Sequence, residues 1–358
     1  MGRYLKPIGG EHWFDIQLFN NKLDNLKNTE AVFLRGGQSA IRFILEDMDI
    51  KPDEYILIPS YLCPNILYNF IMLNIKYEFY KINKDLSIDI NDIEAKMKKF
   101  KIKAIFFIDY FGFYHKKETI NYLEQLKNQN TIIIEDAVQM LWFNRQMFIG
   151  DYVFNSYRKF LPIDGALVLC KNVKTFSPAR DNYYENINLG RIKKTSFLNF
   201  HIGSEEEFLS FYEKAEEQYY RTEGILGMDN VSKTMLSKVD YNLITDIRKR
   251  NYFYLHDRLI ENNKIQIIFS KNLIKDNVVL GLPILIDNRD EIRKKLREIN
   301  IYCPVHWNIL EENWSYKYVD SREISRKIIT LPIDQRYDFH DMNKLIDCMS
   351  NLIGDDII

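Results

Sequence analysis

The feature that most constrains the fold is an alternation of short apolar runs and helical periods between residues 31 and 170. SAIRFILEDM (39–48) and KKETINYLEQLKNQ (116–129) repeat apolar residues with the period of a helix. Continuous apolar strands separated by helices are typical of a mostly parallel sheet that is covered on both faces, so the sequence predicts an α/β fold. The runs that resemble strands are rich in Ile, Val and Phe: YILIPS (55–60), KAIFFID (103–109), TIIIED (131–136), YVFNS (152–156) and ALVLC (166–170).

The rest of the chain predicts a second, smaller unit, as a length of 358 residues favours. Residues 171–235 are polar, charged and aromatic, and we expect one helix there, ending at Gly224, and no strand. A longer helix at about 236–262 would link the two units. We therefore expect a large domain at 1–240 and a small C-terminal α+β domain at 241–358. The small domain would contain VVLGLPILI (278–286), the helical RDEIRKKLREIN (289–300) and a final helix near 340–352.

Charge and cysteine content exclude several classes of function. Lys and Arg number 49 against 50 Asp and Glu, which gives no bulk electrostatic reason to expect nucleic acid or an anionic membrane as partner. The near-zero net charge is compatible with a small neutral or anionic ligand. No run of about 18 apolar residues and no signal-peptide pattern occurs, so we expect a cytoplasmic protein. Four widely separated cysteines predict neither a metal site nor disulfides: Cys63, Cys170, Cys303 and Cys348.

Polar residues that could bind a ligand occur where the predicted strands end, at the edge where α/β sheets place their functional groups. In FLRGGQSAIRF, Gly36 and Gly37 permit a tight turn, and Gln38 and Ser39 would open a helix whose amides can hold a phosphate. A plain tight turn is the alternative. Asp136 ends the strand in IIIEDAVQ, where a buried carboxylate needs a cation or hydrogen bonds. The alternative there is the N-cap of a following helix.

A lysine lies in an aromatic and apolar run, FNSYRKFLPIDGALVL (154–169). Burial among such neighbours would lower the pKa of the Lys159 amine, as a nucleophilic Schiff-base lysine requires. Alternatively, its amine reaches water past the aromatic rings. In IPSYLCPNI (58–66), a turn after a strand could lay Tyr61 or Cys63 against a planar ligand, and core packing explains that segment equally well.

Taken together, a glycine-rich helix start, an Asp at a strand end and a Lys 23 residues later (159 minus 136) resemble the fold-type-I pyridoxal-phosphate (PLP) enzymes. More narrowly, the chain resembles the DegT/DnrJ/EryC1/StrS family of sugar aminotransferases. The resemblance spans most of the chain, is strongest from 33 to 170 and is thin from 171 to 230. The matching segments are GGQSAI, IPSYLCPNI, IDYFGF, IIEDAVQ, GDYVFNSYRKF and LPIDQRY.

The resemblance implies a role for each matching residue. Lys159 would hold PLP as a Schiff base and then move protons between the cofactor's carbon atoms. Asp136 would pair with the pyridinium nitrogen, and Gln139, three residues on and so on the same helical side, would bond the ring hydroxyl. Cys63 aligns where many members carry an aromatic residue that stacks on the ring. The phosphate would be held at the helix start and the strand end by Gly37, Gln38, Ser39 and Ser156.

The chain also departs from the family pattern. Only Tyr157 and Arg158 separate Ser156 from Lys159, where the family usually has Ser-x-x-x-x-Lys. The segment that reaches the neighbouring subunit's cofactor has its nearest match in GMDNVSKTMLSK (227–238), with Asn230, Ser232 or Lys233 as candidates.

The resemblance implies a homodimeric aminotransferase that moves an amino group from an amino acid such as glutamate to a nucleotide-linked keto sugar. A PLP enzyme of another reaction type or with a non-sugar ketone, and a catalytically silent PLP-fold binding protein, are the alternatives. Outside the matching segments, His306 and Trp307 either face the active site or serve packing or a hydrogen bond that fixes the tautomer, and we favour the second interpretation. The cluster RKRN (248–251) could meet a nucleotide phosphate or a substrate carboxylate, but a solvated helix face is favoured. His12 and Trp13 are too isolated to interpret.

Overall fold

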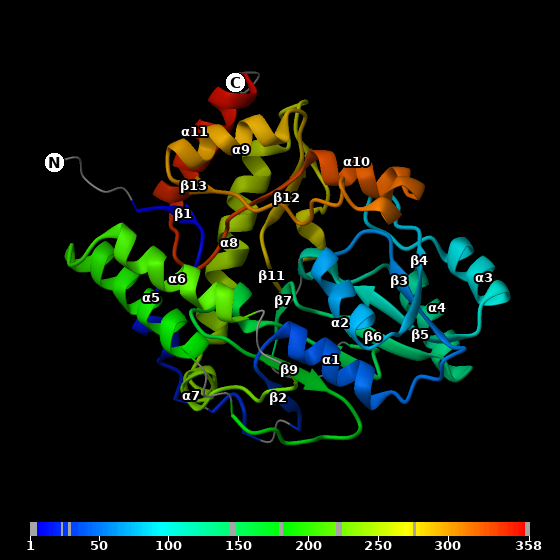
Figure 1. The fold of residues 1–358 in the computed structure, drawn as a ribbon. Coiled ribbons are helices and arrows are strands. Elements are labelled where there is room, and N and C mark those ends of the chain that lie inside the picture. Colours follow the sequence, from blue (N-terminus) through cyan, green and yellow to red (C-terminus); the bar gives the residue numbers. More distant parts are fainter. Residues whose placement is uncertain are drawn as a thin grey trace.

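A seven-stranded sheet lies at the centre of the computed structural model, which describes residues 6–22, 24–27, 30–142, 148–178, 182–219, 224–274 and 277–354 (Figure 1). Its strand order is β2-β9-β8-β6-β5-β3-β4. All neighbouring pairs among β4, β3, β5, β6 and β8 are parallel, while β9 is antiparallel to both of its neighbours. This confirms the α/β fold. The strands are β2 (Val32–Leu34), β3 (Tyr55–Pro59), β4 (Lys76–Tyr80), β5 (Ile102–Ile108), β6 (Ile132–Asp136), β8 (Tyr152–Phe154) and β9 (Ala166–Leu169).

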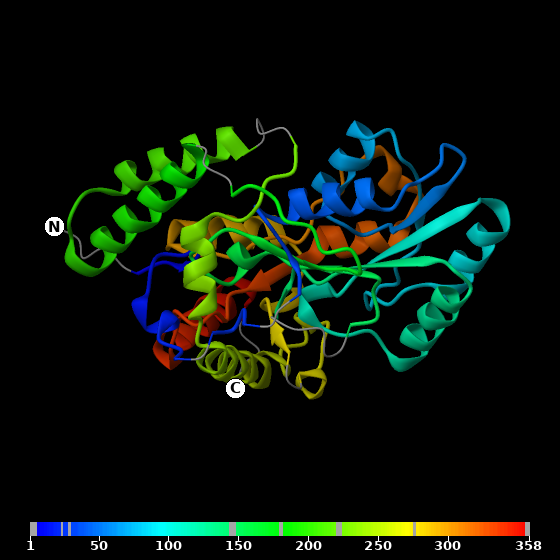
Figure 2. The ribbon, with the colours of Figure 1, turned by 90° about the horizontal axis from the view of Figure 1, so that it is seen from below.

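Helices cover both faces of this sheet, with α1 on one side and α4 on the other (Figure 2). The central strands are buried on both faces, which explains their continuous apolar sequence. The five predicted strands are confirmed, whereas β2 and β4 were not expected. β2 has only three residues, and β4 (KYEFY) interrupts its apolar positions with charges. The covering helices are α1 (Gly37–Asp47), α2 (Leu67–Met72), α3 (Ile90–Lys99) and α4 (Lys117–Asn128).

Two paired helices, α5 (Asn182–Phe200) and α6 (Glu205–Tyr219), project from the body of the molecule in both ribbon views (Figures 1 and 2). Only one helix was expected here, and the described part of α6 ends at Tyr219. The two helices approach closely at Gly190, where a Cβ atom would lie 2.6 Å from the Tyr212 ring. The sequence pattern missed α5 because charged Arg191 and Lys194 occupy buried positions on it.

The helix expected at 236–262 is shorter and is preceded by a separate one. α7 spans Asn230–Ser237, and α8 spans Tyr241–Leu259 and lies at one side of the molecule (Figure 2). The Asp240 side chain accepts a hydrogen bond from the Leu243 amide at 3.0 Å and so begins α8.

The C-terminal part contains a three-stranded antiparallel sheet in the order β10-β12-β14. VVLGLPILI is divided at Gly281, where a Cβ atom would lie 2.9 Å from the Leu331 carbonyl oxygen. Its first half, β11 (Val278–Val279), pairs with β7 (Met140–Leu141) instead. The remaining elements are β10 (Gln266–Ile267), β12 (Leu282–Leu285), α9 (Arg289–Glu298), β13 (Ile301–Tyr302), α10 (Val319–Lys327), β14 (Ile328–Leu331) and α11 (Phe339–Ile353).

The N-terminal segment lies against this C-terminal part. β1 (Ile8–Gly9) pairs in parallel with β13, with Ile8 opposite Ile301. The chain then continues through exposed Gly10 and half-buried Glu11 to His12, which is buried. Among the helices that the structure describes, none is both long and apolar enough to cross a membrane.

Candidate active site

The carboxyl ends of β6 and β8 meet the start of α1. The Ala137 amide, directly after β6, donates a hydrogen bond to the Phe154 carbonyl at 2.9 Å. A Cβ atom at Gly37 would lie 4.0 Å from the Ser156 Cβ and 3.9 Å from a methyl group of Val138. Three segments predicted from the sequence as ligand-binding are therefore brought together.

Lys159 follows β8 in a short 3-10 turn, Tyr157–Lys159. The turn is fixed because the Tyr157 amide donates to the Gly165 carbonyl and because the rings of Tyr157 and Phe160 are fully buried. The side chain of Lys159 is half-buried in the wall of a cavity. Burial lowers the pKa of its amine, and the neighbouring Arg158 charge lowers it further. The lysine thus has the environment of a nucleophile.

Asp136 is a buried carboxylate whose hydrogen-bond donor is a neutral backbone amide rather than a cation. Its Oδ1 accepts from the Val138 amide at 2.9 Å, and no Lys or Arg of the described chain lies within ion-pair distance. Burial raises the pKa of Asp136 to about 7, although the Val138 bond and the Lys159 charge both oppose this. The N-cap alternative is wrong, because a turn rather than a helix follows β6.

Gln139 lies on that turn, so its position does not come from the helix that the sequence suggested. Its Oε1 accepts from the Phe111 amide at 2.7 Å, and its buried Nε2 has no partner in the part of the chain that is described. Phe111 and Gly112 both have positive φ, and a Cβ atom at Gly112 would lie 2.6 Å from the Gln139 carbonyl oxygen. The turn in IDYFGF therefore fixes Gln139 and leaves its Nε2 amino group for an acceptor.

A further pair of carboxyl groups lies behind Asp136. Glu135 accepts from the amides of Ile149 at 2.9 Å and Gly150 at 2.7 Å, and burial raises its pKa to about 7. Burial and the Glu135 charge raise the pKa of Asp109 well above its ordinary value. Asp109 was not singled out in the sequence, although FFID ends a strand in the same way as IIIED.

The segment IPSYLCPNI divides into a packing residue and a site residue. The Tyr61 ring is fully buried, and its hydroxyl accepts from the Trp307 amide at 2.7 Å, so core packing explains Tyr61. Cys63 is partly exposed, and its thiol experiences the charges of both Lys159 and Asp136. Burial raises the pKa of this thiol. Cys63 therefore lies at the edge of the candidate active site, near Lys159 and Asp136.

The start of α1 offers backbone amides rather than side chains. The Gln38 side chain is engaged elsewhere, because its Nε2 donates to the Asn65 carbonyl at 3.1 Å and its Oε1 accepts from Asn69 at 2.7 Å. The amides of the first turn have no acceptor within the helix, so those of Gln38 and Ser39 can bind an anion. Ser156, buried and adjacent to Gly37, is the neighbouring hydroxyl.

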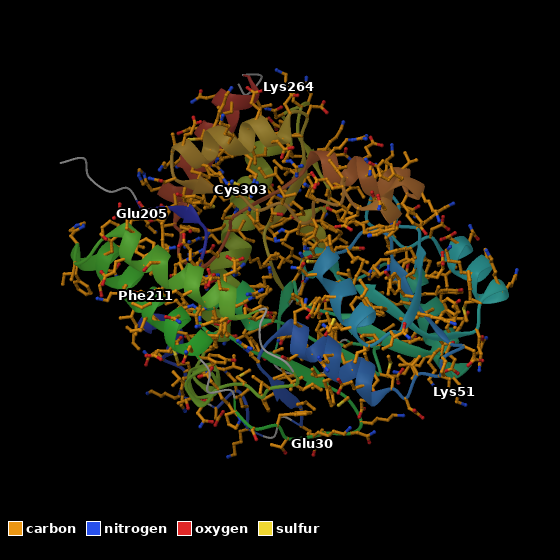
Figure 3. The ribbon with its side chains drawn as sticks, in the orientation of Figure 1. Glu30, Lys51, Glu205, Phe211, Lys264 and Cys303 are labelled. Carbon is orange, nitrogen blue, oxygen red and sulfur yellow. The ribbon has the colours of Figure 1, made fainter. Side chains whose placement is uncertain are left out.

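The cavity beside Lys159 has a volume of about 380 Å³. It runs from the N-terminal segment 9–12 to the C-terminal part, where Cys303 lies beneath α9 (Figure 3). Positive charge predominates in its lining, because Glu11 and Asp334 are outnumbered by Lys159 and the arginines. Those arginines are Arg158, Arg248, Arg293, Arg297 and Arg336.

Two residues that we interpreted as packing or surface positions line this cavity. Arg248 is 1% exposed, so the solvated-face interpretation is wrong for this residue, although Arg250 of the same cluster is exposed. The Arg248 guanidinium donates to the Gln335 Oε1 at 2.9 Å. The signal was its place four residues from both Ile244 and Tyr252 in a buried stripe. His306 packs on the ring of Phe111 and also lines the cavity, where burial and the Lys159 charge lower its pKa to about 3. His12, which the sequence left uninterpreted, lies there too.

These residues fit PLP. An unpaired buried amide at Gln139 matches a ring oxygen, a buried carboxylate without a cation at Asp136 matches a protonated ring nitrogen, and the Lys159 amine is the group that would attach the cofactor. No group of metal-binding side chains occurs in the described ranges.

The fold is shared with solved sugar aminotransferases. A DegT DnrJ EryC1 StrS aminotransferase from Brucella abortus is 16% identical with a TM-score of 0.62, over 93% of this chain and 92% of that one. The putative sugar aminotransferase Spr1654 from Streptococcus pneumoniae, in its PMP form, is 13% identical with a TM-score of 0.69, over 97% and 98%. CalS13 from Micromonospora echinospora, a sugar aminotransferase, is 10% identical with a TM-score of 0.61, over 91% and 88%. No protein-family model and no curated protein matches the sequence.

Proposed function

We propose that the protein is a PLP-dependent aminotransferase of the DegT/DnrJ/EryC1/StrS type. The observation that carries this proposal is the convergence of Lys159, Asp136 and the unpaired Gln139 amide at the carboxyl ends of β6 and β8. The shared fold with solved sugar aminotransferases supports it. A protein kept only for binding would have no use for a desolvated amine opposite a buried, unpaired carboxylate.

When bound, PLP supplies a ring that accepts the electron pair released at the substrate carbon. Asp136 keeps a proton on the ring nitrogen, because a carboxylate buried without a cation favours an N–H⁺ partner. Gln139 orients the ring by donating from Nε2. The lowered pKa of Lys159 gives its amine the neutral form that a nucleophile and a general base require.

The amino donor is an amino acid such as glutamate, and the acceptor is a nucleotide-linked keto sugar. The predominantly basic lining of the cavity supports anionic substrates of this kind. We also propose that the protein is a cytoplasmic homodimer and that each subunit consists of two domains with a boundary at about residue 240. All four cysteines would be reduced, since each is free in the structure. Asn230, Ser232 and Lys233, at the start of α7, stay candidates for contact with the neighbouring subunit's cofactor.

The proposal is tested by adding PLP to the purified protein and following the yellow absorbance of the bound cofactor. Glutamate and a panel of keto-sugar nucleotides are then supplied, and 2-oxoglutarate is measured. We expect 2-oxoglutarate in a 1:1 ratio with amino sugar, and loss of both signals in Lys159→Ala. Lys171→Ala, at an exposed lysine, is the matched control.

Each alternative predicts a different result. Turnover of substrate without consumption of an amino donor would show a PLP enzyme of another reaction type. Bound cofactor with no turnover of any substrate would favour a binding protein, and the absence of absorbance in the wild type would contradict PLP binding itself.

A further inference from the structure

Arg158 is a charged residue directly before Lys159. Its side chain is exposed into the cavity that Lys159 also lines. Across the described ranges its guanidinium takes part in no ion pair or hydrogen bond, and its Cζ lies 5.0 Å from the centre of the Tyr219 ring. A guanidinium held against an aromatic face in a concave site has its N–H groups available for a ligand.

The carboxylates near Arg158 are engaged elsewhere. Both oxygens of Asp164 are used, because Oδ1 accepts from the Tyr183 hydroxyl at 2.6 Å and Oδ2 from Arg191 at 2.6 Å. The Glu11 Oε1 also accepts from Arg191, at 2.8 Å. Burial opposes the charge of Arg158, but Tyr219, Tyr183, Asp164 and Glu11 together raise its pKa, so it is positively charged at any physiological pH.

The position of Arg158 points to the start of α1. A Cβ atom at Gly36, the N-cap of α1, would lie 3.2 Å from the Tyr219 hydroxyl, so the ring beneath Arg158 also reaches this helix end. Ser156 lies two residues before Arg158 and against Gly37. The Tyr219 ring therefore links the Arg158 guanidinium to the start of α1, against which Ser156 also lies.

A phosphate dianion is the ligand chemistry that suits these groups. Arginine binds phosphate through two parallel hydrogen bonds, and a helix N-terminus adds about half a positive charge. Building on the proposed function, we propose that Arg158 binds the phosphate of the cofactor. It thereby adds a charged group to the Ser156 hydroxyl and the amides of α1.

The test compares PLP with pyridoxal, which lacks the phosphate. Dissociation constants for both are measured by absorbance with the wild type, Arg158→Gln and Arg158→Lys. We expect the wild type to prefer PLP, and Arg158→Gln to lose about 10- to 100-fold of that preference while its affinity for pyridoxal stays nearly unchanged. Arg158→Lys, which keeps the charge without the two-pronged geometry, should lose less.

Arg42→Gln is the matched control, because this substitution removes an equal charge outside the cavity. Arg42 lies on α1 and pairs with Glu46 at 2.8 Å. An equal loss of PLP and pyridoxal affinity in Arg158→Gln and Arg158→Lys would overturn the inference in favour of a structural role. An unchanged preference for PLP with a raised KM for the amino donor would overturn it in favour of substrate binding. In both cases the wild type still binds PLP, so the proposed function stands; a wild type without PLP binding would overturn both proposals.

Discussion

Two groups of charged residues differ in how they are neutralised. In α5 and the C-terminal part, two buried arginines each pair with a carboxylate: Arg191 lies 2.6 Å from Asp164, and Arg336 lies 2.7 Å from Asp334. At the ends of β6 and β8, Lys159 and Asp136 make no such pair.

The difference separates charges that maintain structure from charges that await a ligand. A buried ion pair is costly to break, because removal of one partner leaves the other desolvated. A buried charge without a partner is unfavourable in the folded state, and such strain is concentrated where a ligand or reaction uses it. Substitutions in the two groups should therefore affect stability and activity in opposite proportions.

The largest effect on activity is expected for Lys159→Ala. Removal of the nucleophile and proton carrier should lower kcat/KM by at least about 10³-fold. The free energy of unfolding should not fall, because burial already disfavours the charged amine. Activity assays and thermal unfolding measured on one preparation check both parts. A variant as active as Lys171→Ala would contradict the assignment.

The largest effect on stability is expected for Asp164→Ala. This change leaves Arg191 buried without one of its two carboxylates, and we expect the free energy of unfolding to fall by about 3–5 kcal/mol. Asp136→Asn provides the comparison, since it removes a buried charge that lacks a cation and should cost far less. Denaturant unfolding gives both values, and equal losses would show that the two groups of charges do not differ.

A smaller, pH-dependent effect is expected for Asp109→Asn. The pKa of Asp109 is raised in the folded state, so the folded protein binds more protons at Asp109 than the unfolded chain does. This contribution to stability is present below the unfolded pKa of about 4 and is lost as pH rises. Between pH 4 and 8, the wild type should lose on the order of 1 kcal/mol more than Asp109→Asn. Parallel stability curves for the two proteins would contradict the shifted pKa.

The smallest effect is expected on the titration of Lys159 in the cofactor-free protein. Because the Arg158 charge lowers the pKa of the Lys159 amine, Arg158→Gln should move that pKa upward. The rate at which an amine-specific reagent modifies Lys159 as a function of pH, followed by peptide mapping, measures this. A shift in the downward direction would exclude direct electrostatic coupling between the two residues.

The sequence predicted the part of the candidate site that lies at strand ends and at a helix start, and it missed the part that distant segments supply. Gly37, Asp136 and Lys159 each follow a strand or open a helix within a local pattern, so their meeting at one sheet edge could be expected. Gln139 was predicted for the wrong reason, since a turn held by Phe111 and Gly112 places it.

Long-range contacts explain what could not be predicted. Glu11 and His12 reach the cavity because Ile8 pairs with Ile301, and no local pattern encodes a partner 293 residues away (301 minus 8). Arg248 was misread because it belongs to the charged cluster RKRN, and the local sequence does not show the acceptors that a buried guanidinium needs. Here the carbonyls of Val279 and Leu280 accept from its guanidinium.

The most direct measurement of the central claim is to load the protein with PLP, reduce it with borohydride and map the modified peptide by mass spectrometry. The account predicts one reduced phosphopyridoxyl group per chain, attached to Lys159. Attachment to a different lysine, or the absence of any modified peptide after saturation with PLP, would contradict it.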